Sequence, residues 1–248
     1  MADFSLKRPD KWDIAYTFDK GNKDLCVLYL HGWLANRHRQ KGVTAQDVAR
    51  REGCSYLSLD YTAHGESGGK PTDFTIGQAI EDSMDVIQKT IPNIPLIIIG
   101  NSVGGWIGLW LAERLKQVVG FIGLAPAPDI TDWVWNNMLP DSAKALLDGG
   151  HVLGPSEQTY GFCFTKQIFK DGEEHFMLKR PIDFKGPVRI LWGDQDDRIE
   201  KSRINAIKDR LVSDNVAVTL IKGADHHLSR ERDLKILSDV LKTMIREV

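Results

Sequence analysis

The sequence predicts an α/β protein in which helices flank a mostly parallel central sheet. Three observations carry this prediction. Short, almost continuously apolar runs alternate with longer amphipathic runs, as buried parallel strands alternate with the helices that cover them. A glycine-rich turn directly follows one of the apolar runs. The 248 residues are 42% hydrophobic and 27% charged, which is typical of one globular domain that folds without disulfides or metal.

The apolar runs give the order of the strands. The run at 25–30 (LCVLYL) is apolar almost without a break, as expected of a strand that is covered on both faces. An opening strand precedes it, and shorter runs of the same type follow. The expected strands cover residues 12–18, 25–30, 56–59, 96–99, 118–124, 188–192 and 216–221.

Helices are expected between these strands. Thr75 and Gln78 have capping-box spacing, and apolar residues at helical spacing follow them. The C-terminal stretch carries four apolar residues along one face, so we expect an amphipathic helix that docks on the sheet. These four residues are Leu234, Leu237, Leu241 and Ile245.

The stretch at 129–183 interrupts the alternation. It separates two expected strands and is much longer than the usual connection. Between Trp133 and Phe176 it has about twice the 8% aromatic content of the whole chain. We expect a small helical lid inside the single domain 1–248, with Trp133, Trp135 and Phe164 lining the substrate pocket. The alternative is that these rings pack a small core of their own. The remaining aromatic residues of the group are Tyr160, Phe162, Phe169 and Phe176.

Charge and cysteine content exclude several classes of protein. The net charge of -2 lacks the basic excess that nucleic acids and anionic membranes require. Cys26, Cys54 and Cys163 form no pair with zinc or redox spacing, which predicts free thiols in a reducing compartment. The apolar runs are shorter than the roughly 20 residues of a spanning helix, and no targeting segment is visible. We expect a cytoplasmic protein without cofactor or metal, or a mitochondrial one if a precursor was trimmed.

The most informative run is Gly100-Asn-Ser102-Val-Gly104, which follows the strand at 96–99. A Gly-x-Ser-x-Gly run between a buried strand and an apolar helix is typical of a nucleophile elbow. The serine of an elbow sits in a strained turn, and the flanking glycines keep other side chains away. We therefore predict that Ser102 is a catalytic nucleophile. The alternative is a glycine-rich turn with an idle serine.

A serine nucleophile needs a base that is held by an acid, and in this arrangement the chain order is serine, acid, histidine. The strand at 188–192 is followed by Gly193 and then by Asp194, Asp196 and Asp197. Asp196 stands three residues past the glycine, a common position for the acid, and is our prediction. Asp194 and Asp197 remain as alternatives.

The base is expected after the last strand, in the run Asp225-His226-His227. Adjacent histidines point apart, so one of them is the base; we predict His226 and keep His227 as the alternative. A metal site is not expected, because no third ligand stands at useful spacing. His31 and His64 flank glycines in loops beside the predicted site and are expected to act as hydrogen-bonding struts.

Two backbone N–H groups should stabilise the oxyanion. One belongs to Val103, directly after the nucleophile, and the other to the loop at 31–34. Trp33 is the predicted donor in that loop, with Leu34 as the alternative. The polar, glycine-rich loop at 60–68 is expected to support the site.

Together these motifs resemble the α/β-hydrolase superfamily over nearly the whole chain. Within it, the sequence resembles the branch of mitochondrial abhydrolase-domain serine esterases of animals, which are known as palmitoyl-protein thioesterases and acyl-glucuronide esterases. The resemblance implies that Ser102, Asp196 and His226 are nucleophile, acid and base. Asn101 departs from the small, serine-like residue expected of this branch.

The sequence therefore predicts a serine hydrolase that cleaves carboxylic esters or thioesters through an acyl-enzyme on Ser102. The expected substrate is a small molecule or an acylated protein with an apolar acyl group. One alternative is a carbon–carbon bond hydrolase with the same triad. Another is a ligand-binding member of the fold without catalysis, against which the intact set of three residues argues.

Overall fold

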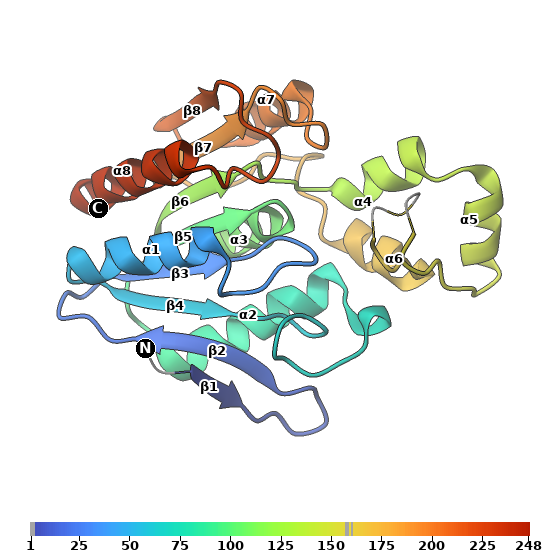
Figure 1. The fold of residues 1–248 in the computed structure, drawn as a ribbon, viewed down its shortest axis with the longest axis horizontal. Coiled ribbons are helices and arrows are strands. Elements are labelled where there is room, and N and C mark those ends of the chain that lie inside the picture. The colour runs from blue at the N-terminus through green and yellow to red at the C-terminus, as the bar shows by residue number, and fades with distance from the viewer. Residues whose placement is uncertain (1–2, 157–158, 160) are drawn as a thin grey trace.

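The computed structural model describes residues 3–156, 159 and 161–248. Tyr160, one of the aromatic residues noted above, lies outside the described residues. An eight-stranded sheet crosses the molecule and has helices on both faces (Figure 1). The predicted fold class is thereby confirmed.

The strands lie in the order β1-β2-β4-β3-β5-β6-β7-β8. β1 and β2 run antiparallel to their neighbours. The other six strands, β3 to β8, run parallel to one another. The expected strands are all present, and β1 is an addition to them. Their bounds are β1 Asp3–Leu6, β2 Ile14–Asp19, β3 Cys26–Leu30, β4 Ser55–Leu59, β5 Leu96–Asn101, β6 Val118–Leu124, β7 Val188–Gly193 and β8 Val216–Ile221.

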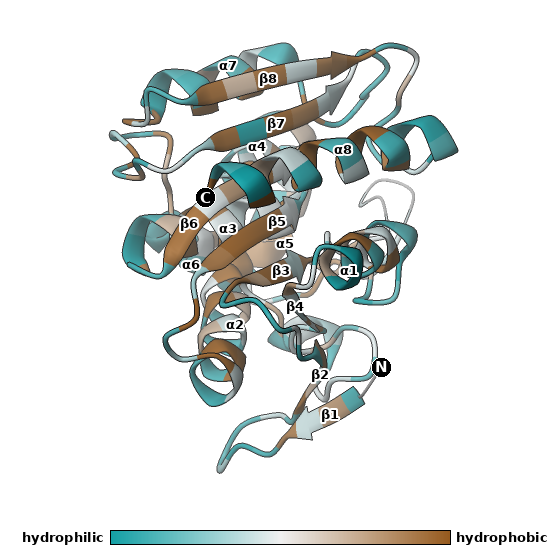
Figure 2. Cartoon of the chain, turned by 90° about the vertical axis from the view of Figure 1, so that its left-hand side faces the viewer, coloured by the Kyte–Doolittle hydropathy of each residue, from teal (hydrophilic) through white to brown (hydrophobic). Residues whose placement is uncertain are grey.

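Helices cover the two faces of the sheet with separate apolar clusters. α1 (Gln40–Arg51) and α8 (Glu231–Glu247) pack on one face, while α2 (Ile76–Thr90), α3 (Val103–Arg114) and α7 (Lys201–Arg210) pack on the other. Figure 2 shows the polar sides of α1 and α8 turned away from the sheet. The apolar faces predicted by helical spacing are therefore the faces that are buried.

The cap of α2 is only half of the predicted box. The Thr75 hydroxyl accepts a hydrogen bond from the Gln78 N–H at 3.1 Å. The Gln78 side chain does not return to Thr75 but donates to Asp82 at 2.9 Å. Asp82 is fully buried beside the N-terminal hairpin, where it also pairs with Arg8, and it therefore competes for the amide.

The segment between β6 and β7 projects from one end of the sheet (Figure 1). Two hydrogen bonds fix the second half of this segment to α3 and α2. The Trp106 indole donates to the His175 carbonyl at 3.1 Å, and the Gly77 N–H donates to Asp171 at 2.8 Å. A short 3₁₀ turn, η1 (Pro71–Asp73), precedes α2. The elements of the projecting segment are α4 Ile130–Trp133, η2 Val134–Met138, α5 Asp141–Asp148 and α6 Lys166–Glu174.

The carboxyl ends of the parallel strands lie at the end of the sheet that faces this segment (Figure 1). The loops after β3, β5, β7 and β8 carry the predicted oxyanion donor, nucleophile, acid and base. The loops that follow the carboxyl ends of parallel strands lie together at one end of the sheet, which is where open α/β sheets bind their ligands. The fold therefore brings together four segments that are far apart in the chain.

Candidate active site

Ser102 occupies a strained turn between β5 and α3. Its backbone has φ 53° and ψ -118°, a conformation that costs a non-glycine residue about 1–3 kcal/mol. Neighbouring backbone holds the turn: the Ser102 N–H donates to Leu124 at 2.9 Å, and its carbonyl accepts from Gly105 and Ala127 at 2.8 and 3.0 Å. The geometry is that of a nucleophile elbow, as the sequence predicts.

The glycines of the elbow are required by close backbone contacts. A Cβ at Gly100 would lie 2.3 Å from the Gly104 carbonyl oxygen, and one at Gly104 would lie 2.3 Å from the Leu30 carbonyl oxygen. On the same helix face, a Cβ at Gly108 would lie 2.9 Å from the Ile98 side chain. Three small residues thus let α3 begin directly against β3 and β5, with Ser102 at its N-terminus.

His226 joins Ser102 to Asp196. Its Nε2 lies 3.2 Å from the Ser102 Oγ, and its Nδ1 lies 3.0 and 3.1 Å from the two carboxylate oxygens of Asp196. His227 is turned away and exposed, with its ring centre 6.0 Å from that of His226. Of the two adjacent histidines, the structure brings the predicted one to the serine.

The buried Asp196 carboxylate is held by its own turn. One oxygen accepts the N–H groups of Arg198 and Ile199, both at 2.9 Å. Burial on its own would raise the pKa of Asp196, but the bond to His226, the charge of that ring and the two backbone donors outweigh it, so the pKa lies below its ordinary value. Asp196 is therefore an ionised group that can fix the orientation of His226.

The other two aspartates of this turn have different surroundings. The Asp194 carboxylate accepts a hydrogen bond from the N–H of Gly223 and so connects the turn after β7 to the loop after β8. Asp197 is exposed at the rim of the cavity that contains Ser102. A Cβ at Gly193 would lie 2.1 Å from the Ala224 carbonyl oxygen, so the two loops are also in direct backbone contact.

The loop after β3 lies against the elbow. A Cβ on Gly32 would be 3.3 Å from the Ser102 Cβ. The Leu34 N–H donates to His64 Nε2 at 3.3 Å, whereas the N–H groups of Trp33 and Val103 have no acceptor among the described residues. Of the two candidate N–H groups in this loop, that of Trp33 is the one without a bond to the described residues.

His64 is a strut between two loops. Its Nδ1 lies 3.1 Å from the Thr62 carbonyl oxygen, so the proton belongs on Nδ1 and Nε2 is free to accept the Leu34 N–H. Burial lowers the pKa of His64 and keeps the ring neutral. The loop at 60–68 is also fixed by Asp60, which is buried and pairs with the buried Arg37.

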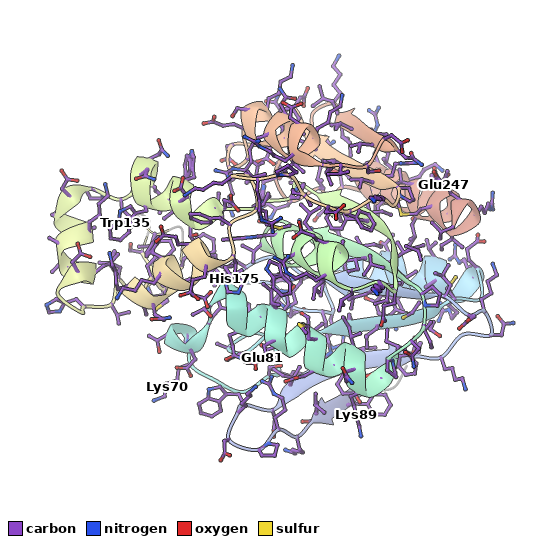
Figure 3. All side chains as sticks on the ribbon, turned by 180° about the vertical axis from the view of Figure 1, so that it is seen from behind. Lys70, Glu81, Lys89, Trp135, His175 and Glu247 are labelled. Atoms are coloured by element: carbon purple, nitrogen blue, oxygen red, sulfur yellow. The ribbon has the colours of Figure 1, made fainter. Side chains whose placement is uncertain are left out.

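An apolar cavity opens beside Ser102. Trp133 is the one predicted lid residue that lines it. Trp135 instead packs on Phe169, with ring centres 4.9 Å apart, and Phe164 is 1% exposed in the core. Figure 3 shows Trp135 on the projecting segment. The complete lining is Trp33, Ser102, Val103, Ile130, Trp133, Val134, Met138, Phe162, Asp197, Arg198, Ile199 and His226.

Phe162 and Met138 line the cavity as well, although their positions in the sequence did not mark them as pocket residues. Phe162 packs on the Trp33 ring with 4.4 Å between ring centres. Trp33 therefore touches the projecting segment with its side chain while its backbone faces the elbow. The high aromatic content of the segment indicated a pocket, but it did not indicate which of the aromatic side chains point into it.

Residues 3–156, 159 and 161–248 include neither a membrane-spanning helix nor a metal-binding cluster. No helix among them is long and apolar enough to cross a membrane. Within the same residues, no group of three His, Cys, Asp or Glu side chains is placed to hold a metal ion.

The chain is similar to known proteins over nearly its whole length. Residues 26–143 match the family model of the alpha/beta hydrolase fold. The mitochondrial palmitoyl-protein thioesterase ABHD10 of Bos taurus is 29% identical over 243 residues, which cover 97% of this chain and 79% of that protein. A monoacylglycerol lipase of Mycolicibacterium smegmatis is 23% identical, covering 88% of this chain and 87% of that protein. The solved structure of mouse alpha/beta hydrolase domain-containing protein 10 superposes with a TM-score of 0.89 at 26% identity, covering 100% of this chain and 99% of that one. The chain therefore has the α/β-hydrolase fold, and its relatives indicate a hydrolase enzyme.

Proposed function

We propose that the chain is a serine hydrolase that cleaves carboxylic esters or thioesters through an acyl-enzyme on Ser102. One observation carries the proposal: His226 lies within hydrogen-bonding distance of both the Ser102 hydroxyl and the Asp196 carboxylate. A serine, a histidine and an aspartate linked by hydrogen bonds in this order convert a weakly nucleophilic hydroxyl into an attacking group.

In the proposed acylation step, His226 Nε2 takes the proton of the Ser102 hydroxyl as its oxygen attacks the substrate carbonyl. Asp196 keeps the other ring proton on Nδ1 and stabilises the imidazolium that forms. The N–H groups of Trp33 and Val103 donate to the oxyanion, which is the group that gains charge in the transition state. The imidazolium then protonates the leaving alcohol or thiol as the carbon–oxygen or carbon–sulfur bond breaks.

In the proposed deacylation step, water replaces the leaving group. His226 takes a proton from the water, whose oxygen attacks the acyl carbonyl, and returns that proton to the Ser102 oxygen. The products are a carboxylic acid and the free enzyme. Both steps use the same donors, because each passes through a tetrahedral intermediate with its negative oxygen in the same place.

The cavity beside Ser102 supports an apolar acyl group. Its wall is formed largely by Ile130, Trp133, Val134, Met138 and Phe162, which offer contact area but few hydrogen-bonding groups. The names of the relatives describe an acyl thioesterase and a lipase of acylglycerols, which supports the same substrate class. We propose that residues 129–183 form the lid over this pocket.

The location of the protein in the cell belongs to the proposal as well. The names of several relatives place those proteins in mitochondria. A mitochondrial location is the reading that these relatives support, and the cytoplasmic location stays a prediction from the sequence.

The experiment that tests the proposal is a substrate panel. The purified protein is assayed with p-nitrophenyl esters and with acyl-coenzyme A and S-acyl peptide thioesters of increasing acyl length. We expect turnover of the esters or thioesters, with loss of all turnover in folded Ser102→Ala. Turnover that survives in this variant would overturn the proposal, and so would the absence of turnover on every member of both series.

A further inference from the structure

The two edges of the sheet are built differently. β8 is the last strand in the sheet order and, within the described residues, pairs with β7 alone. Four consecutive residues, Ala217, Val218, Thr219 and Leu220, are exposed, so both faces of this strand reach the surface. Leu220 is 56% and Val218 39% exposed, and Figure 2 shows the strand as largely hydrophobic.

An exposed edge strand is a template for pairing with another strand, and proteins usually block it with charge, proline or a bulge. β8 contains none of these: its sequence is VAVTLI, and its six residues pair with β7 without a register shift. The opposite edge strand, β1, has four residues and begins with Asp3, which lies 3.6 Å from Arg37. The β8 edge is therefore the unprotected one.

We propose that β8 pairs antiparallel with β8 of a second copy of this chain, which joins the two sheets across a two-fold axis. A two-fold interface uses the same surface on both partners, so the strand must be complementary to itself when its direction is reversed. The sequence around β8 has this property, which singles out a second copy as the partner.

The self-complementary register is centred on Val218. Opposite residues of paired strands lie on the same face of a sheet, which places Val218 against its copy and Val216 against Leu220. The chain on either side of the strand then brings Asp214 of one copy close to Lys222 of the other. This one register gives three apolar pairs, since the pair of Val216 and Leu220 occurs twice, and two opposite-charge pairs.

Both flanking charges are available for this contact. Asp214 and Lys222 are exposed, and neither side chain has a hydrogen bond or ion pair within the described part of the chain. Opposite charges across a strand pair stabilise it, and like charges destabilise it. The charges therefore select the antiparallel register and supply a way to test it.

The first test measures the oligomeric state of the full chain by sedimentation velocity from low micromolar to several hundred micromolar protein. We expect a monomer–dimer equilibrium that Leu220→Lys shifts towards the monomer by more than tenfold in Kd. The matched control is Leu146→Lys on α5, which replaces an exposed leucine elsewhere (46% exposed) and should leave Kd unchanged. A parent protein that stays monomeric throughout overturns the proposal, and so does a dimer that tolerates Leu220→Lys.

The second test checks the register by charge exchange. Asp214→Lys and Lys222→Asp each place like charges together and should weaken the dimer by roughly 2- to 30-fold, from the usual energies of two cross-strand pairs. The double variant should restore the parent Kd. Circular dichroism and thermal unfolding establish that each variant is folded. A double variant as weak as either single variant would overturn the antiparallel β8 register.

Discussion

Three aspartates share the turn after β7, but each has a different set of partners. Asp196 alone reaches His226, at 3.0 Å, while Asp194 accepts a backbone N–H and Asp197 is exposed. Asp196→Asn should therefore lower kcat by about 10⁴-fold, as expected when the acid no longer fixes the histidine tautomer. Steady-state kinetics on the best ester checks this value.

The neighbouring positions are the controls for that substitution. Asp197→Asn should change kcat little, and Asp194→Asn should act mainly through the turn that it braces. A large loss in Asp197→Asn together with a small loss in Asp196→Asn would contradict the assignment of the acid.

His64 gives a second prediction at this scale, because its Nε2 accepts the Leu34 N–H and so holds the loop that carries Trp33. His64→Ala should lower kcat by up to about 10²-fold, the smaller effect seen when an oxyanion donor is lost. KM should change little, since the apolar acyl pocket is intact. Both parameters are measured on one ester series.

Rescue separates positioning from general loss of structure. His64→Gln retains a donor and an acceptor and should recover part of kcat. If His64→Ala lowers the unfolding temperature and leaves kcat unchanged, the histidine supports the fold but not the loop geometry.

The sequence was most informative about residues whose role is tied to local pattern. Ser102 is marked by its glycines, whose close contacts leave no room for a side chain, and Asp196 by its distance from Gly193. The role of His64 was predictable only as a strut, because its partner Leu34 lies 30 residues away in the chain. Such a contact depends on the packing of two loops and has no signature in either.

At the scale of elements, strands with a continuous apolar run were predictable, and β1, which has none, was not. β3 and β5 are buried along their whole length, and their apolar runs show it. β1 (Asp3–Leu6) is mostly exposed, so its four residues carry no continuous apolar pattern. It forms because the chain turns back to pair with β2, a tertiary effect that the run itself does not encode.

The segment between β6 and β7 shows the same limit for side-chain direction. Its helical nature and aromatic content were predictable, but only Trp133 of the three chosen aromatic residues lines the cavity beside Ser102. Trp135 lies two residues further on and carries the Lys166 ammonium 4.0 Å above its ring. Residues two apart in a helical segment lie on nearly opposite faces, so the two tryptophans have different surroundings.

These two tryptophans form a matched pair for testing the pocket. Burying one more CH₂ group contributes about 0.8 kcal/mol, so kcat/KM of the parent should rise roughly fourfold per carbon until the cavity is full. Trp133→Ala should flatten this dependence, whereas Trp135→Ala should preserve it. Measurement of kcat/KM from acetyl to longer esters checks both variants.

Phe164 adds the contrast of a core residue. With 1% of its surface exposed, Phe164→Ala should lower the free energy of unfolding by about 3–5 kcal/mol and leave the chain-length preference unchanged. Equal chain-length profiles in the parent, Trp133→Ala and Trp135→Ala would show that the segment does not shape the acyl pocket.

At the scale of the whole molecule, buried histidines couple stability to pH. Burial, together with His64 and Arg37, lowers the pKa of His31 to about 3. Asp60 lies 3.7 Å from His31 Nε2, but its charge is already neutralised by Arg37. Below the ordinary histidine pKa of 6.5 the unfolded chain gains a proton that the folded protein does not bind, so stability must fall as pH falls.

Urea unfolding between about pH 7 and pH 5 tests this coupling. The free energy of unfolding should fall with a slope of up to about 1.4 kcal/mol per pH unit for each such histidine. His31→Asn should reduce the slope, while His151→Asn, at an exposed position, should keep it. Identical slopes in the parent and His31→Asn would exclude His31 as a source of the acid instability.

We propose that the hydroxyl of Ser102, whose backbone is strained, is the nucleophile of a serine hydrolase. A fluorophosphonate reagent tests it most directly, because it reacts covalently with a serine that a neighbouring base activates. We expect a single adduct per chain, mapped by peptide mass spectrometry to Ser102 and absent from folded Ser102→Ala. Failure of the folded parent protein to react, or an adduct on another residue that persists in Ser102→Ala, would contradict it.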